Sequence, residues 1–241
     1  MQTRMPGRSR PRRYSRLFDR RHSQEDHPSH RPSGANRSPP SPRSPSDPEN
    51  HEGSPMKFIA IDFETATCSA DSACALGIVS IEKGRITKSE HRLIRPPRRH
   101  FTFSYLHGIS WTDVKAEPTF IKVWEGLTPL WEGADYFLAH NAPFDRNVLA
   151  ACCSAVGQCP PEVPFICTVR IARSHWNIRP TNLPAVCAQL GIALDHHNAA
   201  SDALACALIA LRAMNEGFPI HSAEVGRHHK RPRPRRRRQS D

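Results

Sequence analysis

The segment KFIAIDFETA, residues 57–66, combines a strand pattern with two acids, Asp62 and Glu64. Its apolar residues predict a strand packed in a core. Side chains two residues apart on a strand point to the same face, so the two carboxylates lie together while Phe63 points to the opposite face. Like charges this close raise each other's pKa unless a cation lies between them. Taken alone, the pair predicts either a cation site or a strand end that exposes two acids to solvent.

The basic charge of the chain lies outside its apolar middle. The 241 residues have a formal net charge of +11. Residues 1–55 hold eleven Arg against six acids, and residues 226–241 hold eight basic residues against one acid. Residues 56–225 hold fifteen basic residues against sixteen acids. The overall basicity therefore does not identify the folded part as a nucleic-acid binder.

The two ends of the chain have compositions typical of disorder. Residues 1–55 are rich in Arg, Ser and Pro and have no hydrophobic period, so we expect a disordered leader. Met56, immediately before the first strand, is an alternative start of the native protein. We expect one folded domain at residues 56–220 and a disordered basic tail at residues 221–241. The tail is either an arm that attracts phosphates or a solvated segment without a role.

The cysteines and the hydropathy pattern indicate a cytoplasmic protein. None of the eight cysteines forms a CxxC pair, and most lie in apolar periodic stretches, where a free thiol behaves as a small hydrophobe. We therefore expect reduced thiols. No apolar run approaches the length of a membrane span, so no membrane association is expected.

The middle of the chain alternates between strand and helix patterns. Three strands come first, the second and third joined by a hairpin at Gly84, and two shorter strands follow among helices. The strand segments begin at Lys57, Ala73, Arg85, Tyr136 and Pro164. Helices are expected over 118–131, 143–156, 181–191 and 198–217, with a short one before Trp176. This order predicts an α/β fold with a mixed five-stranded sheet flanked by helices.

Two further acids stand at the start of helices. Asp145 ends the segment HNAPFD, residues 140–145, where the helix dipole alone would favour an acid. Asp202 ends the segment HNAASD, residues 197–202, at the start of a helix that is apolar almost all round. A buried aspartate there predicts a recessed site, and we expect His197 to lie on the preceding loop and lean over it.

Four carboxylates from three elements predict a site for hard divalent cations. Mg²⁺ and Mn²⁺ prefer oxygen ligands, and two such ions together stabilise both the attacking and the leaving oxygen of a phosphodiester. We therefore expect two divalent cations, Mg²⁺ or Mn²⁺, as cofactors. The expected ligands are Asp62, Glu64, Asp145 and Asp202.

These three elements resemble the three motifs of the DnaQ-like family of DEDDh 3′→5′ exonucleases, which includes the proofreading subunit of bacterial DNA polymerase III. The resemblance covers about residues 56–216. Asp62 and Glu64 match the DxE motif, Asp145 matches the second aspartate, and His197 with Asp202 matches the HxxxxD motif. The resemblance implies a ribonuclease H-like fold, hydrolysis with two metal ions and His197 as the general base. The implied product is a nucleoside 5′-monophosphate.

The same resemblance implies residues that bind the substrate. The segment YLHGIS is similar to a family segment beside the terminal nucleotide, which implies a contact from His107. Thr65 is expected near the terminal 3′-hydroxyl, with Asn141 as a further contact. Phe63 and Phe144 are candidates for stacking on bases, although strand alternation places Phe63 in the core.

Three alternatives stay open at this point. A DNA exonuclease is the leading hypothesis, with nucleic-acid 3′ ends as partner and a polymerase as a second partner. An RNA-trimming enzyme would use the same motifs, and a catalytically silent adaptor for nucleic acid or a polymerase would keep the fold. No Cys and His spacing resembles a closed zinc site. His196 and His197 are expected to diverge, as neighbours do on any regular element.

Overall fold

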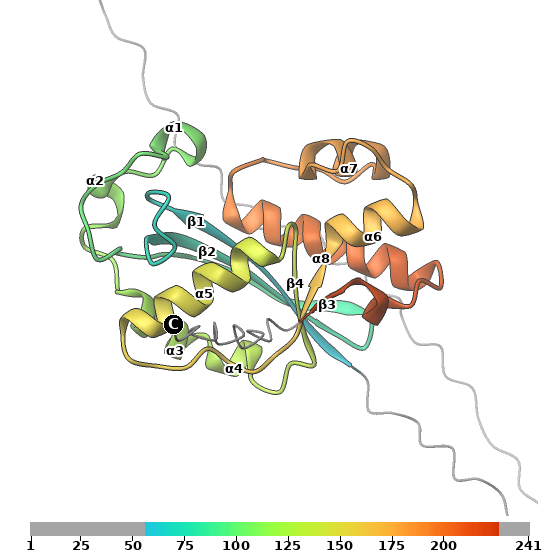
Figure 1. Cartoon of the computed structure of the whole chain (residues 1–241), viewed down its shortest axis with the longest axis horizontal. Helices are drawn as coiled ribbons and strands as arrows, with labels where there is room; N and C mark the ends of the chain where they lie inside the picture. Colours follow the sequence, from blue (N-terminus) through green and yellow to red (C-terminus); the bar gives the residue numbers. More distant parts are fainter. Residues whose placement is uncertain (1–55, 227–241) are drawn as a thin grey trace, which may run out of the picture. The chain divides into compact units, whose positions relative to one another are not determined.

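A mixed sheet of six strands forms the centre of the molecule (Figure 1). The computed structural model describes residues 56–226, so the expected leader and residues 227–241 of the expected tail lie outside the described residues. The strand order is β3-β2-β1-β4-β5-β6. The strands are β1 Lys57–Thr65, β2 Ala73–Glu82, β3 Arg85–Leu93, β4 Tyr136–Ala139, β5 Phe165–Cys167 and β6 Glu224–Val225.

The expected α/β class is confirmed, but the expected number of strands is wrong. β1 pairs antiparallel with β2 and parallel with β4, which makes the sheet mixed. The sixth strand, β6, lies beyond residue 220, in the segment that the sequence assigned to the tail. Val225 pairs with Phe165 and is 7% exposed, so apolar burial holds this short segment on the sheet. The Arg170 side chain also donates a hydrogen bond to the Glu224 carbonyl.

Eight α-helices and one 3-10 helix surround the sheet within residues 56–226. The four short ones before β4 are α1 Ser104–His107, α2 Trp111–Val114, α3 Phe120–Gly126 and α4 Thr128–Trp131. The later ones are α5 Pro143–Ala155, α6 Thr168–His175, α7 Leu183–Leu190, α8 Ala199–Asn215 and the 3-10 helix Ile220–Ala223. The helix expected over 118–131 is split in two, because Pro129 has no N–H to continue the hydrogen-bond ladder of α3.

The alternation of β1 divides the core into two layers. Ile59, Ile61 and Phe63 belong to a cluster with α3, α4 and α5, whereas Phe58 and Ala60 belong to a cluster with α6 and α8. Figure 1 shows the strands running between these two groups of helices. The even-numbered side chains of β1 therefore face α8. Asp62 and Glu64, at the end of β1, are even-numbered residues, so they point toward the start of α8.

None of the eight cysteines, all of which lie within the described residues, forms a disulfide, and six of them are buried. Between residues 56 and 226 the structure contains no helix with the length and apolar character that a membrane crossing requires.

Candidate active site

Three carboxylates from β1 and α8 converge at one point. Asp62 and Glu64 come from the end of β1, and Asp202 comes from the first turn of α8. One oxygen from each carboxylate lies within 4.8 Å of the others. Glu64 and Asp202 are buried, and Asp62 is half-buried. The cluster therefore combines the donor atoms that hard cations prefer with partial exclusion of water.

The fourth expected acid lies beside this cluster and not within it. Asp145 sits in the first turn of α5, on the opposite layer, and is 1% exposed. Its Oδ1 accepts a hydrogen bond of 3.1 Å from the backbone N–H of Phe63. Because Phe63 stands between Asp62 and Glu64, this bond fixes α5 against the acidic end of β1.

Burial raises the pKa of all four acids, and the charges of neighbouring acids add to this shift at Asp62, Glu64 and Asp145. Burial raises the pKa of Asp62 well above its ordinary value, and the charges of Asp145 and Asp202 raise it further. Burial, followed by the charge of Asp202, raises the pKa of Glu64 to about 8. Burial also raises the pKa of Asp145 to about 8. These carboxylates cannot all ionise cheaply near neutral pH unless a cation compensates their charge.

Asp202 shows directly that the site fits a cation. Its Oδ2 accepts hydrogen bonds from the backbone N–H of His197 at 3.1 Å and from the His196 ring at 3.0 Å. Its Oδ1 is buried and has no hydrogen-bond partner among the described residues. A buried oxygen without a partner is costly, and a metal ion beside Asp62 and Glu64 would satisfy it.

His197 lies on the loop before α8, as the sequence predicts. Its φ of 65° is in the left-handed region, which is uncommon for a residue other than glycine. Burial, together with the charge of His196, lowers the pKa of its imidazole. The ring is therefore mainly neutral near pH 7 and is able to accept a proton.

The expectation that His196 and His197 diverge is wrong. Their rings stack with centroids 3.9 Å apart, because the left-handed backbone of His197 turns both side chains to the same side. His196 donates through Nδ1 to Oδ2 of Asp202, and sequence reasoning missed this contact. The available signal was that His196 directly precedes the first residue of the HxxxxD motif, in a loop where neighbouring side chains need not diverge.

Gly77 is a second residue that the sequence reasoning missed. It pairs with Asp62 across β1 and β2. A Cβ at this position would overlap the backbone carbonyl of Ala199, at the start of α8. The absence of a side chain therefore lets α8 approach the sheet closely enough to bring Asp202 to Asp62. A glycine inside a strand pattern is the signal for such an approach.

Thr65 and His107 are close together, beside a pocket of about 470 Å³ that His197 also lines. Thr65 is buried, and its carbonyl lies 3.2 Å from Nε2 of His107. The other ring nitrogen of His107 accepts the backbone N–H of Ile109 at 3.0 Å. Both nitrogens of His107 are thus used inside the protein, so this ring supports Thr65 and presents its carbon edge to the pocket.

The remaining expected substrate contacts have different environments. Phe63 is 3% exposed and packs against Phe120, so it belongs to the core and presents no surface for stacking on a base. Phe144 is 44% exposed in the first turn of α5. Asn141 is exposed, has a φ of 65°, and accepts the backbone N–H of Phe144 with its carbonyl. Phe144 and Asn141 therefore stand at the surface next to Asp145.

A mixed sheet between two helical layers, with an acidic cluster at the end of its central strand, defines a nuclease of the ribonuclease H-like fold. Residues 59–210 match the model of the exonuclease family (RNase_T). The chain therefore belongs to the exonuclease family and is a hydrolase.

Curated relatives support this assignment. The chain is 30% identical over 159 residues to the PolC-type DNA polymerase III of Thermotoga petrophila, a match that covers 64% of this chain and 12% of the polymerase. It is 28% identical over 163 residues to exodeoxyribonuclease 10 of Escherichia coli K12, covering 64% of this chain and 67% of that protein. The matched region thus spans about an eighth of the PolC-type relative.

Solved structures share the fold. Exonuclease X in complex with 5′ overhanging duplex DNA superposes with a TM-score of 0.53 at 22% identity, over 69% of this chain and 96% of that one. The nuclease domain of 3′hExo, a DEDDh family member bound to rAMP, superposes with a TM-score of 0.60 at 19% identity, over 69% and 95% of the two chains.

Proposed function

We propose that this protein is a metal-dependent 3′→5′ exonuclease that removes nucleoside 5′-monophosphates from the 3′ ends of DNA, mainly single-stranded DNA. The observation that carries the proposal is the buried Oδ1 of Asp202, which has no hydrogen-bond partner among the described residues and belongs to a carboxylate cluster within 4.8 Å of Asp62 and Glu64. Such a cluster needs positive charge, and a phosphodiester substrate needs the same positive charge during its hydrolysis.

Asp62, Glu64 and Asp202 would hold the cations, and Asp145 would complete the second site or orient water. The proposed cofactors are two divalent cations, Mg²⁺ or Mn²⁺. When bound, they supply the positive charge that stabilises the phosphodiester transition state. The bond from Phe63 to Asp145 holds one oxygen of that carboxylate and leaves its other oxygen for this role.

His197 is the proposed general base. A ring nitrogen of His197 takes a proton from the attacking water while the water oxygen bonds to phosphorus. The bond between phosphorus and the 3′-oxygen of the preceding nucleotide breaks, and that oxygen takes a proton from solvent. The lowered pKa of His197 keeps the ring ready to accept the proton near neutral pH.

The residues around the site suggest how the 3′ end is held. We assign Thr65 to the terminal 3′-hydroxyl and Asn141 and Phe144 to the nucleotides at the surface beside Asp145. His107 supports Thr65 through its hydrogen bond to the Thr65 carbonyl and lines the pocket with its ring edge. The assignments of Asn141 and Phe144 rest on position and exposure, whereas that of Thr65 rests on its place at the end of β1, directly after Glu64.

The names of the relatives favour DNA as the substrate. Exodeoxyribonuclease 10 and the PolC-type DNA polymerase are both DNA enzymes by name. The PolC relation also supports a polymerase as partner. A structural neighbour described as recognising the 3′ end of a histone mRNA stem-loop keeps RNA trimming as the second candidate.

The test uses 5′-labelled single-stranded DNA and RNA oligonucleotides with Mg²⁺, Mn²⁺ or EDTA, and sequencing gels to display the products. We expect a ladder that shortens from the 3′ end of DNA, and no products in EDTA or with the Asp202→Asn protein. Glu125→Gln, which neutralises an exposed acid on α3, is the matched control and should behave as wild type.

Two outcomes would change the proposal. A ladder on RNA with DNA left intact would replace DNA by RNA as substrate. Intact oligonucleotides with both metals would favour the catalytically silent adaptor, although all five motif residues are present.

A further inference from the structure

A second hollow lies on the surface bounded by residues 95–99, α2, the start of α3 and the end of α5. Its volume is about 800 Å³. Three cationic side chains line it, together with the indole of Trp111 and the ring of Phe120. The cations are Arg95, Arg99 and Lys115, and all three are exposed.

The charge of this groove is uncompensated among the described residues. Arg95, Arg99 and Lys115 make no ion pair there with any carboxylate of residues 56–226. The one acid that lines the groove, Asp71, is engaged in an ion pair and a hydrogen bond with Arg98. A domain whose net charge is close to zero thus carries a local excess of positive charge.

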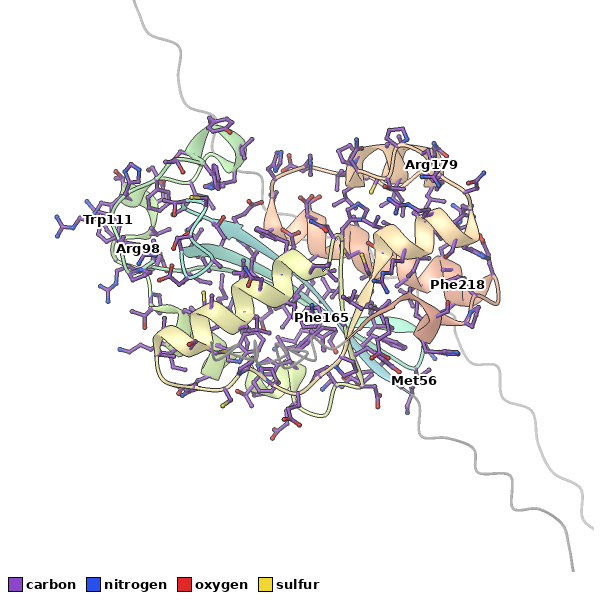
Figure 2. The ribbon with its side chains drawn as sticks, in the orientation of Figure 1. Met56, Arg98, Trp111, Phe165, Arg179 and Phe218 are labelled. Atoms are coloured by element: carbon purple, nitrogen blue, oxygen red, sulfur yellow. The ribbon has the colours of Figure 1, made fainter. Side chains whose placement is uncertain are left out.

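An aromatic ring and a guanidinium form one wall of the groove. The Arg99 guanidinium lies 5.5 Å from the centroid of the Trp111 ring, a distance at which cation–π attraction holds it in place. Grooves that bind single-stranded nucleic acid combine cations for the backbone with aromatic or guanidinium planes for the bases. Figure 2 shows Trp111 and Arg98 at the same edge of the molecule, on the side of α1 and α2.

The groove is built on a fixed frame. The backbone N–H of Arg95 donates to the Pro118 carbonyl at 2.9 Å, and Arg95 forms a parallel bridge with Thr119. Pro96 and Pro97 follow directly and restrict the backbone. The backbone that carries Arg95 is therefore fixed before any ligand arrives, which lowers the entropic cost of binding.

The residues that follow Arg99 connect the groove to the acidic site. The backbone N–H groups of Thr102 and Phe103 both donate to the Ala66 carbonyl, at 2.7 and 3.2 Å. Ala66 follows Thr65, the last residue of β1. Phe120, in the groove wall, also packs on Phe63, which separates the two acids. The groove and the acidic site are therefore attached to the same end of β1.

We propose that this groove binds the sugar–phosphate backbone of the substrate strand, several nucleotides away from the 3′ end that is cleaved. The inference rests on the proposed exonuclease function and extends it by naming where the uncleaved part of the strand is held. Arg95, Arg99 and Lys115 contact phosphates, and Trp111 offers its edge to a base or sugar. The groove thus makes long strands better substrates than short ones.

The test compares a groove variant with a charge-matched control. The groove variant carries Arg95→Gln, Arg99→Gln and Lys115→Gln. The control variant carries Lys83→Gln, Arg85→Gln and Arg179→Gln, which removes the same charge from exposed positions outside the groove. Figure 2 shows Arg179 on the side of the molecule opposite Trp111.

Steady-state kinetics would be measured on a dinucleotide and on a strand of about 20 nucleotides, which exceeds the ~4–16 nucleotides of a typical single-strand site. We expect the groove variant to raise KM for the long strand at least about tenfold with kcat unchanged, and to leave the dinucleotide unaffected. For the groove variant, the slope of log(kcat/KM) against log[salt] should become less negative by about 2. Each phosphate contact on a single strand contributes ~0.7 to this slope, and the variant loses three such contacts.

The outcomes separate the inference from the proposed function. If wild-type protein cleaves neither substrate, the exonuclease proposal fails. If wild type cleaves both and the groove variant matches the control on the long strand, the groove inference is overturned while the function stands. Equal losses on both substrates also overturn it, because the groove would then act through the site. If the groove variant lost binding to a poly-glutamate peptide but cleaved both strands with wild-type kinetics, the groove would be assigned to an acidic protein segment instead.

Discussion

At the scale of single residues, Asp202 has two oxygens in opposite environments. Oδ2 accepts two hydrogen bonds from the histidine loop, and Oδ1 is buried without a partner among the described residues. The loop therefore orients the carboxylate and leaves its second oxygen directed at the site. A ligand held in this way needs little reorganisation when a cation binds.

We expect Asp202→Asn to separate activity from stability. The amide would lose a cation ligand, so activity should fall by at least ~10²–10³-fold, as when one preorganised electrostatic group is removed. In EDTA the free energy of unfolding should rise by about 1–3 kcal/mol, because an amide N–H in place of Oδ1 can donate to the neighbouring carboxylates. Single-turnover rates and denaturant melts measure the two effects. If the Asp202→Asn protein were less stable than wild type in EDTA, the result would contradict repulsion among the carboxylates of the site.

The two histidines should differ in their roles. If His197 is the base, His197→Gln should lower kcat by about 10²–10⁴-fold and abolish the rise of kcat with pH, because the group that must lose its proton is gone. His196→Gln should keep that pH profile and instead weaken metal binding about 10–100-fold, as loss of a group that orients a ligand does. Rates against pH and against metal concentration distinguish the variants. If the His197→Gln protein kept the wild-type dependence of kcat on pH, His197 would not be the general base.

At the scale of elements, the site depends on how closely α8 approaches β2. The helix presents alanines to the sheet, and nine of its seventeen residues are buried. Its N-terminus is capped by Asn198, whose side chain accepts the backbone N–H groups of Ala200 and Ser201. Gly77 provides the space on the strand side. Small residues on both surfaces therefore determine the distance between Asp202 and Asp62.

Gly77→Ala should move the start of α8 away from β2. The new methyl group would overlap the backbone carbonyl of Ala199, which cannot rotate away as a side chain would. We expect a destabilisation of about 1–3 kcal/mol from overpacking and an activity loss of about 10²-fold from misplacement of Asp202. Denaturant melts and kcat/KM measure these changes.

Gly126→Ala is the matched control for that variant. It makes the same substitution at the last residue of α3, where a Cβ would meet nothing within 4 Å. It should leave activity unchanged and be neutral or slightly stabilising, since Ala favours helices over Gly by up to ~1 kcal/mol. If both variants lost activity equally, the close approach at Gly77 would not explain the effect.

At the scale of the whole molecule, the acidic site lowers stability when no metal is bound. The pKa values of Glu64 and Asp145 in the folded state are raised to about 8, above those of an unfolded chain. A carboxyl with a raised folded pKa binds more protons in the folded state. Its contribution to stability is therefore complete at pH values below about 4, the pKa of the group in the unfolded chain. The contribution is lost as the pH rises through the pKa of the group in the folded protein.

We expect the metal-free protein to lose a few kcal/mol of unfolding free energy between about pH 5 and pH 8. Mg²⁺ or Mn²⁺ should remove most of this slope, because a bound cation favours the ionised carboxylates and stabilises only the folded state. Thermal and denaturant melts across this range, in EDTA and with metal, measure the slope. The Asp145→Asn protein should show a smaller slope, and a metal-free protein that becomes more stable toward pH 8 would contradict the prediction.

Much of the architecture follows from local pattern. The period of two in β1, the glycine of the hairpin, the proline that starts α5 and the capped start of α8 each set an element from a few neighbouring residues. The split of the helix over 118–131 and the strand β6 were not foreseen. The first depended on one proline in an otherwise helical pattern, and the second on two residues that gain burial only against β5.

The sequence by itself determined which residue types stand at which spacing, and therefore the four acids, His197 and the order of the elements that carry them. The tertiary structure decided what no local pattern encodes: that Asp145 lies beside the three-acid cluster and that His196 contacts Asp202. It also brought Arg95, Arg99 and Lys115 into one groove. The physical reason is that periodicity acts between neighbours in the chain, whereas burial, charge repulsion and close approach act between residues that only the packed fold brings together.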